Sequence, residues 1–243
     1  MKQPLRDPYG GRDPREIAAY TTVEAAHYLR IPENTLRAWC FGRSSASRHG
    51  NARRIPSVIK VADPARHLLS FVNLLEMHVL DAIRRRHQVE LKRIRSAIRY
   101  LEDHFSLAHP LVDEAMETDG TDLFISNYGS LINASRHGQM AMREMLKAHL
   151  ERIDRDQHGL AIRLYPFTRK RDLEGAAPDP KLVSIDPRLA FGRPVLSGSR
   201  IPTIEIAERY KAGDSIFDLA EDYGREPFEI EEAIRCELHV DAA

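Results

Sequence analysis

Polar and basic side chains between residues 33 and 54 are of types that bind DNA. Asn34, Thr35 and Arg37 carry amide, hydroxyl and guanidinium groups, which contact base edges and phosphates when a helix presents them to a major groove. Four arginines follow in a stretch rich in glycine and serine, where they suit phosphate contacts: Arg43, Arg48, Arg53 and Arg54. The alternative interpretation is a solvated helix surface followed by a basic solvated loop.

The stretch from Thr21 to Cys40 predicts two short helices around a tight corner, which would position these groups. Thr21 and Glu24 have the spacing of a capping box, so a helix is expected to begin at Thr22. Residues 30–32 predict the corner, because Pro32 cannot continue the first helix but can open the second.

Periodicity indicates which side chains of these helices are buried. In the first helix, Val23, Ala26 and Leu29 fall on one face at steps of three. In the second, Leu36 and Trp39 are expected to point inward. The outer surface would then be shared by Glu33, Asn34, Thr35, Arg37 and Ala38.

The segment after Trp39 predicts a β-hairpin. Gly42 to Arg54 would form its tip and Val58 to Val61 its return strand. A hairpin that carries arginines and follows a helical corner is typical of a winged helix-turn-helix, whose wing touches phosphates.

Two longer helices are predicted next. Ser70 can cap a helix from Phe71 to about Arg86, and a second helix is expected from Glu90 to Phe105. The second carries an apolar stripe, which fits either core packing or a seam between subunits: Leu91, Ile94, Ile98, Leu101 and Phe105. A homodimer is expected, because proteins that read duplex DNA with this motif are usually dimers.

The middle of the chain predicts an α+β region. Residues 111–117 and 123–128 flank an Asp-Gly turn and favour a hairpin. Residues 139–153 have helical spacing, and residues 160–165 favour a strand.

The last third predicts a linker and three short helices. Thr168 to Lys181 loses periodicity and gains proline, glycine and charge, which is typical of a linker. Residues 202–212, 215–223 and 227–239 predict the helices, with Gly213 and Gly224 as C-terminal caps and Asp214 as an N-cap.

The last two of these helices have the shape of a second helix-turn-helix, but its surface is acidic. The final helix offers Glu229, Glu231 and Glu232, and residues 205–241 hold twelve acidic and four basic residues. Such charge repels phosphate, so this unit is expected to bind a protein.

The fold class is expected to be α+β, mainly α with small β elements. The distribution of charge suggests that the two ends of the chain bind different partners. The net charge is zero, but residues 1–60 carry plus 6 and residues 161–243 carry minus 4. The expected segments are a loose arm (1–18), a winged helix-turn-helix domain (19–108), a central α+β region (109–168), a linker (169–181) and a C-terminal helical domain (182–243).

The sequence also argues against several classes of protein. Cys40 and Cys236 are the only cysteines, which fits a reducing compartment without disulfides. No apolar run approaches the roughly 20 residues of a membrane span, and the first residues lack the apolar core of a signal peptide. We therefore expect a cytoplasmic protein. The chain has no metal-ligand spacing, phosphate loop or nucleophile elbow, so we expect neither a catalytic site nor a cofactor.

The stretch FGRPVLSGSRIP, followed by AGDSIFDLAEDYG, resembles the antitoxin-associated "domain of unknown function 433". Seven residues match the usual G-K/R-P-x-x-x-G-T-R-I-P core: Gly192, Arg193, Pro194, Gly198, Arg200, Ile201 and Pro202. Ser199 stands where threonine is usual and keeps the hydroxyl. The front half, through LLSFVNLLEMHVLDAIRRR and ISNYGSLINASRHGQMAMREML, resembles the DNA-binding part of VapB-type antitoxins that carry this tail.

The resemblance implies a type II antitoxin that binds double-stranded operator DNA and neutralises a VapC-type toxin, a PIN-domain ribonuclease. The alternative is a stand-alone helix-turn-helix transcriptional regulator that uses its acidic C-terminal domain for dimerisation or another protein partner.

Two sets of basic residues could contact that toxin. Arg193 and Arg200 could be exposed anchors, or Arg200 could instead pin a carboxylate of the following helices while Gly192 and Gly198 allow a tight corner. The linker residues Arg169, Lys170 and Arg171 could insert among the carboxylates of a PIN site, or could be a solvated charge run.

Overall fold

The structure is a computed structural model, and it describes residues 9–45, 53–84, 91–117, 119–131, 136–169 and 180–238. The described helices are α1 (Thr22–Leu29), α2 (Glu33–Phe41), α3 (Phe71–Arg84), α4 (Leu91–Phe105), α5 (Asp119–Leu131), α6 (Arg136–Leu150), α7 (Thr203–Ala212), α8 (Ile216–Tyr223) and α9 (Pro227–Glu237), with two 3₁₀ turns, η1 (Glu114–Met116) and η2 (Ala190–Gly192). The described strands are β1 (Arg43–Ser45), β2 (Arg53–Ile55), β3 (Ile153–Arg155), β4 (Ala161–Leu164), β5 (Val183–Ser184) and β6 (Val195–Leu196). Each strand pairs antiparallel with its neighbour in sequence, so the predicted mainly α fold with small β elements is confirmed.

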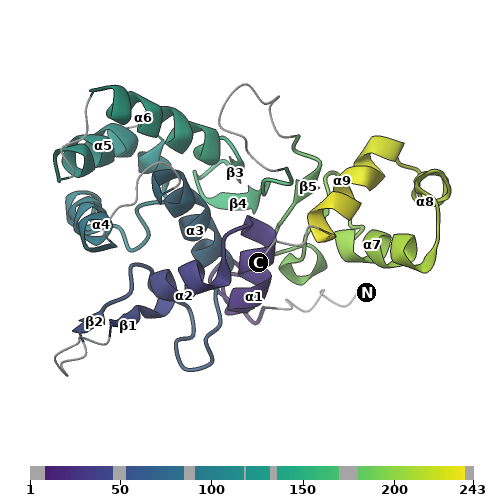
Figure 1. Cartoon of the computed structure of the whole chain (residues 1–243), viewed down its shortest axis with the longest axis horizontal. Helices are drawn as coiled ribbons and strands as arrows, with labels where there is room; N and C mark the ends of the chain where they lie inside the picture. Colours follow the sequence, from purple (N-terminus) through teal and green to yellow (C-terminus); the bar gives the residue numbers. More distant parts are fainter. Residues whose placement is uncertain are drawn as a thin grey trace, which may run out of the picture.

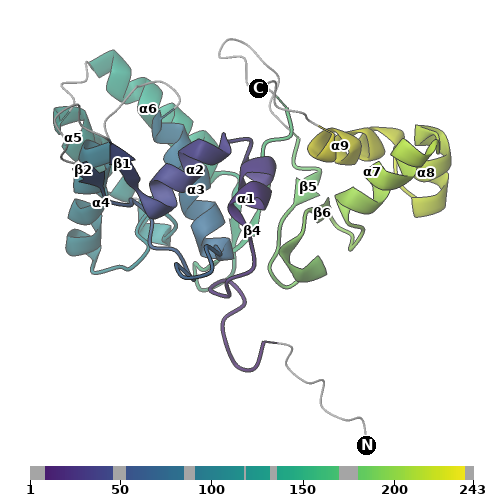
Figure 2. The ribbon, with the colours of Figure 1, turned by 60° about the horizontal axis from the view of Figure 1, so that its bottom comes forward.

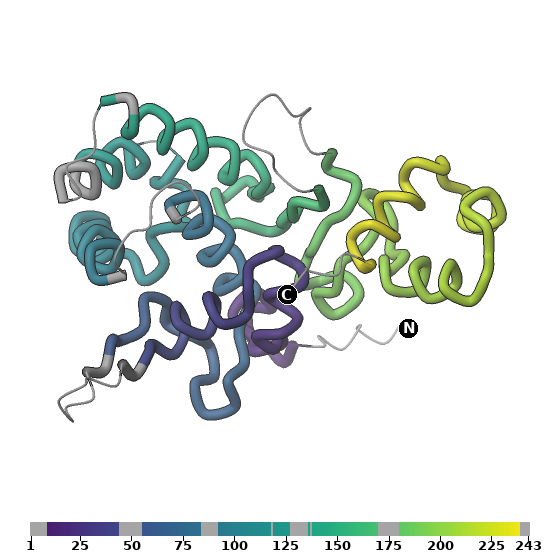
Figure 3. Tube along the Cα trace, in the orientation of Figure 1, coloured from purple at the N-terminus to yellow at the C-terminus, as the bar shows by residue number. Residues whose placement is uncertain are grey.

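The elements form a large body and a smaller lobe. Helices α4–α6 lie on one side of α1–α3, and α7–α9 form a lobe on the opposite side (Figure 1), an arrangement that persists after a 60° turn (Figure 2). The strands β3–β6 lie between the two parts, and the backbone trace runs through them into the lobe (Figure 3).

One hydrophobic core joins the helix corner to the middle of the chain. Buried side chains form one cluster from Tyr20 to Ile185, whereas α7–α9 enclose a separate small cluster around Ile206, Leu219 and Ile230. Helix α3 is the centre of the large core, because its residues are buried on every side from Phe71 to Ile83.

The long helices largely follow the prediction. Ser70 caps α3, since its Oγ accepts a hydrogen bond from the Asn73 backbone N–H at 3.2 Å. The stripe on α4 packs into the core of the same chain, with Ile94 and Leu101 fully buried. Of the two interpretations of that stripe, core packing is therefore the one observed. Arg85, Arg86 and Glu90, at the expected helix ends, lie outside the described residues.

The predicted hairpin around the Asp-Gly turn is wrong. These residues form η1 and then α5, with Asp119 and Asp122 in the first turn, where carboxylates complement the helix dipole. A Cβ at Gly120 would lie 2.7 Å from the Ala115 carbonyl oxygen, so glycine allows α5 to begin against η1. The helix predicted over residues 139–153 is confirmed by α6. The strand predicted over residues 160–165 is confirmed by β4, which pairs with β3.

The three C-terminal helices are confirmed, with one changed cap. Gly213 and Gly224 end α7 and α8 in the left-handed conformation, as predicted. The N-cap of α8 is Ser215, which forms a capping box with Asp218, so the assignment of Asp214 as that cap is wrong. Asp214 instead accepts a 2.6 Å hydrogen bond from Arg209.

Candidate nucleic-acid interface

The corner between α1 and α2 is built from local contacts. The predicted capping box is present: the Thr21 hydroxyl accepts from Glu24 N–H at 3.2 Å, and the Glu24 carboxylate accepts from Thr21 N–H at 2.8 Å. Arg30 ends α1 with φ of 54°, which turns the chain into α2. The Thr22 hydroxyl donates to the Glu33 carboxylate at 2.9 Å and so joins the two helix starts.

The inner faces of these helices differ in part from the prediction. Leu36 and Trp39 of α2 are fully buried as expected, but Ala38 is also buried and not on the surface. On α1 the buried side chains include Ala25 and Leu29, whereas Val23 is 61% exposed. Of the predicted stripe, Leu29 is buried and Ala26 packs against the core partly buried, so only the inward placement of Val23 was wrong.

The outer face of α2 presents the predicted polar side chains. Asn34 and Arg37 are exposed, and Thr35 is half-buried. The Arg37 guanidinium lies 3.7 Å from the Glu33 carboxylate and 5.9 Å from the centre of the Phe41 ring. Because this pair is exposed, phosphate can displace Glu33 at little cost. This face can therefore offer an amide, a hydroxyl and a cation to DNA.

The hairpin that follows α2 is tighter than predicted. Strands β1 and β2 pair with Arg43 opposite Ile55. The return strand is thus residues 53–55 and not 58–61, because the backbone N–H groups of Val58 and Ile59 instead bond to the Trp39 carbonyl oxygen at 2.7 and 3.1 Å.

Two features fix the hairpin to the body. Gly42 has φ of +79°, and a Cβ there would lie 2.2 Å from the Ile55 carbonyl oxygen. The Arg95 side chain of α4 donates to the Ser57 carbonyl at 2.9 Å and also bonds the Pro56 carbonyl. The hairpin base is therefore held between α2 and α4.

The basic residues of this hairpin are only partly described. Arg43 is exposed, and its guanidinium lies 3.5 Å from the Asn34 carbonyl oxygen, which places it beside the start of α2. The backbones of Arg53 and Arg54 lie in β2, whereas Arg48 lies outside the described residues.

The C-terminal lobe docks directly onto α1, which the sequence did not predict. The Tyr20 hydroxyl donates to the Gly192 carbonyl oxygen at 3.0 Å, and His27 Nε2 lies 3.2 Å from the Glu237 carboxylate. The Arg30 guanidinium donates to the Arg235 carbonyl oxygen at 2.9 Å. We call these contacts the α1–lobe seam.

Electrostatics at the seam reflect its burial. Burial raises the pKa of Tyr20, so its hydroxyl stays protonated and can donate the hydrogen bond to Gly192. Burial alone would raise the pKa of Glu237, but hydrogen bonds from His27 and Thr203 hold it below its usual value. The partners at the seam are up to 210 positions apart in sequence, so no local signal could have indicated them.

The candidate partner residues lie in different surroundings. Arg169 pairs with the buried Glu232 at 2.9 Å, and Lys170 and Arg171 lie outside the described residues. Glu232 is 1% exposed, so its placement on the outer surface of α9 was wrong. Hydrogen bonds from Arg169 and Thr168 keep the pKa of Glu232 below its usual value despite its burial.

Arg193 and Arg200 are exposed. Arg200 lines a cleft of about 280 Å³ together with Arg163, Ser184 and Ser199. Within the described part of the chain no carboxylate pairs with Arg200, so the predicted pinning of a helix carboxylate is not observed there. Gly192 does form a tight approach, since a Cβ there would lie 2.0 Å from the Tyr20 hydroxyl.

Other chemistry has little support among the described residues. Burial raises the pKa of the Cys40 and Cys236 thiols to about 12, which makes them poor nucleophiles. Over the described ranges, no group of three or more histidine, cysteine or acidic side chains could hold a metal ion. The described helices include none that is both long and apolar enough to cross a bilayer.

Two parts of the chain match known family models. Residues 18–98 match the family model described as "Putative DNA-binding HTH domain", and residues 183–235 match the model "Protein of unknown function (DUF433)". The first match covers the helix corner and its hairpin, and the second covers the Gly-Arg-Pro motif and most of the lobe.

Proteins of Mycobacterium tuberculosis are similar along most of the chain. "Putative antitoxin VapB45" is 28% identical over 238 residues, which cover 90% of this chain and 93% of that protein. "Uncharacterized protein Rv2308" is 26% identical over 90% of this chain and 89% of its own length. The crystal structure of Rv2018 shares the fold, with a TM-score of 0.65 and 24% identity over 90% of this chain and 98% of that one. These matches confirm the predicted resemblance: one part of the chain matches a putative DNA-binding helix-turn-helix model, another matches the domain of unknown function 433, and the chain is similar to a putative VapB antitoxin along most of its length.

Proposed function

We propose that this protein is the antitoxin of a type II toxin-antitoxin system, which binds its own operator and neutralises a PIN-domain ribonuclease toxin. The observation that carries the proposal is the exposed polar face of α2, held beside a basic hairpin within the matched helix-turn-helix domain. Similarity to "Putative antitoxin VapB45" along nine-tenths of the chain supports the second half of the proposal.

DNA recognition is assigned to two groups of residues. Asn34, Thr35 and Arg37 of α2 enter the major groove, where an amide and a guanidinium discriminate between bases. The arginines of the hairpin bind phosphates of the DNA backbone and so fix the position of the protein along the duplex: Arg43, Arg48, Arg53 and Arg54. A homodimer would bind two half-sites, as is usual for this motif.

Toxin neutralisation is assigned to the C-terminal part. A PIN site is a cluster of carboxylates, and a guanidinium can bind such groups with two hydrogen bonds. Arg193 and Arg200 are exposed and can reach a partner without breaking an ion pair among described residues. Arg169 would first have to leave Glu232, and Lys170 and Arg171 follow it directly in sequence.

The test is co-expression with the product of the adjacent reading frame. We expect a stable complex, loss of ribonuclease activity in that complex, and retarded migration of a fragment of the shared promoter. Arg200→Ala is expected to weaken neutralisation while leaving promoter binding intact. A neighbour without ribonuclease activity, together with intact promoter binding, would instead favour the stand-alone regulator.

A further inference from the structure

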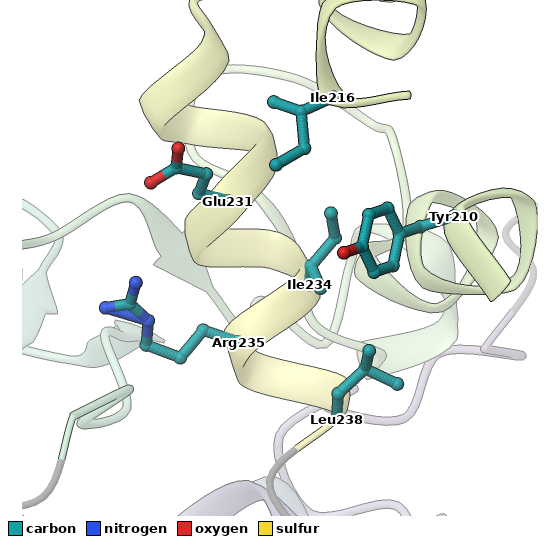
Figure 4. Close-up of a pocket in the computed structure, with 6 residues that line it drawn as sticks. All are labelled: Tyr210, Ile216, Glu231, Ile234, Arg235 and Leu238. Atoms are coloured by element: carbon teal, nitrogen blue, oxygen red, sulfur yellow. The ribbon is translucent and has the colours of Figure 1, made fainter. Parts of the chain in front are cut away.

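The lobe contains an apolar groove along α9. Its lining comes from three helices and the residue after α9: Tyr210, Ile216, Glu231, Ile234, Arg235 and Leu238. Figure 4 shows the Tyr210 side chain beside Ile234, with Ile216 above the pair and Leu238 below it, while Glu231 and Arg235 extend from the other side of α9 in this view. The groove has a volume of about 300 Å³, which suits the insertion of apolar side chains.

Apolar exposure on this lobe is high for its size. Tyr210 is 40% exposed, Phe217 76% and Phe228 55%, although the lobe encloses only a small core. The C-terminal end of α9 is already partly covered, because Glu237 and the Arg235 carbonyl contact His27 and Arg30 at the α1–lobe seam. A small domain that is anchored by one face and exposes aromatic side chains elsewhere has the features of an interaction surface.

Charge around the groove selects the kind of partner. Residues 203–238 hold eleven acidic and four basic residues. In the described chain, six exposed carboxylates of the lobe form no ion pair: Glu205, Glu208, Asp218, Glu221, Glu226 and Glu231. Arg235, the only base among the lining residues, lies 3.7 Å from the buried Glu232. The carboxylate of Glu231 therefore remains available at the rim, where it favours a cationic partner.

The walls of the groove also select a helix over a strand. The lining residues lie on or next to helices, whose backbone groups are already bonded within each helix, so an added strand would find no edge to pair with. An amphipathic helix instead inserts side chains spaced three or four residues apart. Glu231 and Ile234 of α9 and Leu238 directly after it have that same spacing.

We propose that this groove binds a basic amphipathic helix of a protein partner, with apolar side chains packed on Tyr210, Ile234 and Leu238 and a lysine or arginine beside Glu231. The assignment rests on the proposed function in one respect, because the partner would be the toxin that the lobe neutralises.

The test uses a defined probe and the full-length chain. The probe is a fluorescent peptide of about 18 residues, long enough to form a helix when bound, with leucines at helical spacing and lysines elsewhere. Two counterpart peptides replace all lysines by glutamate or all leucines by serine. Binding is measured by fluorescence anisotropy, and the oligomeric state by light scattering.

Matched substitutions locate the binding. Glu231→Lys is compared with Glu205→Lys, the same charge reversal on an exposed residue outside the groove lining. Tyr210→Ala is compared with Tyr100→Ala, since both tyrosines are 40% exposed. We expect the lysine peptide to bind, both groove substitutions to weaken it about tenfold, and both controls to change it less than about twofold.

Three results would overturn the proposal. They are no binding of the lysine peptide to the wild-type chain, equal weakening by groove and control substitutions, or a fall in oligomeric mass with Tyr210→Ala, which would assign the groove to a second copy. A neighbouring gene product without toxicity would contradict the proposed function but not the peptide result. Conversely, if neither groove substitution affects the toxin complex, the groove does not bind the toxin, but the proposed antitoxin function still stands.

Discussion

At the scale of single residues, the proposed DNA contact depends on how α2 and its hairpin present polar groups. Arg37 and Asn34 are three positions apart and share an exposed face, while Arg43 reaches the first turn of α2. Sequence reasoning could select these residues because exposure on a short amphipathic helix follows from periodicity. It could not place the side chain of Arg43, because that depends on the hairpin register.

Gly42 is predicted to be essential for the position of the hairpin. In Gly42→Ala, the new Cβ would collide with the Ile55 carbonyl oxygen and the residue would be strained at positive φ. We expect promoter affinity to fall by about 1–3 kcal/mol, as measured by gel retardation. The control is Gly11→Ala, which has φ of +78° but no atom within 4 Å of the added Cβ. Equal effects of the two substitutions would show that only backbone strain matters.

Arg53 and Arg54 are predicted to contact phosphates and not bases. Replacing either by alanine should lower the affinity about equally for operator and unrelated DNA. The slope of log affinity against log salt concentration should also fall, by about the amount that one phosphate contact contributes. Titrations at several salt concentrations provide the measurement. A selective loss of operator binding would instead place these side chains on bases.

At the scale of elements, the helices with local start and stop signals were predictable. Thr21 and Glu24, Gly213 and Gly224 determine helix ends through contacts a few positions apart. The Asp-Gly pair at residues 119–120 was misread, because acidic residues that suit a turn also suit the first turn of a helix. The choice was decided by packing against η1, which the sequence alone does not indicate.

One pairing between elements should make stability depend on pH. His109 Nδ1 lies 2.9 Å from the Glu76 carboxylate of α3, and this hydrogen bond raises the pKa of His109 above its usual value. A raised folded-state pKa means that the protonated histidine stabilises the fold below about pH 6.5, and that this stabilisation is lost as the pH rises through the folded-state pKa.

His109→Gln should therefore cost about 1–2 kcal/mol of unfolding free energy at pH 5.5, and less at pH 8.5. Urea unfolding of both proteins across this range is the measurement. A difference that stays constant or grows with pH would contradict the charged pair. His158→Gln is a suitable control, because His158 is exposed and outside the ion pairs of the described chain.

At the scale of the whole molecule, the α1–lobe seam joins the candidate DNA reader to the candidate protein-binding lobe. Both ends were predictable as separate units from motif and charge. Their direct contact was not, since it pairs residues from opposite ends of the chain.

Gly192→Ala is predicted to weaken this seam. The added Cβ would lie 2.0 Å from the Tyr20 hydroxyl, whereas Gly198→Ala, at a similar φ of +73°, meets no atom within 4 Å. We expect Gly192→Ala to cost about 1–3 kcal/mol more than Gly198→Ala. Calorimetry should show lobe and body unfolding in one transition in the wild type and in separate transitions in Gly192→Ala. Identical thermograms for the two variants would mean that the seam contributes little.

The central claim is that the outer face of α2 reads the operator. It is tested most directly by the affinity of the full-length chain for a fragment of its own promoter and for unrelated DNA, with Arg37→Ala compared against Arg143→Ala. Arg143 is an exposed arginine on α6 that pairs with Asp122, so its replacement makes the same change in charge away from α2. We expect Arg37→Ala to lose about 1–3 kcal/mol of promoter affinity and most of its preference over unrelated DNA, while Arg143→Ala binds like the wild type. Unchanged promoter affinity and preference in Arg37→Ala would mean that this face does not read the operator.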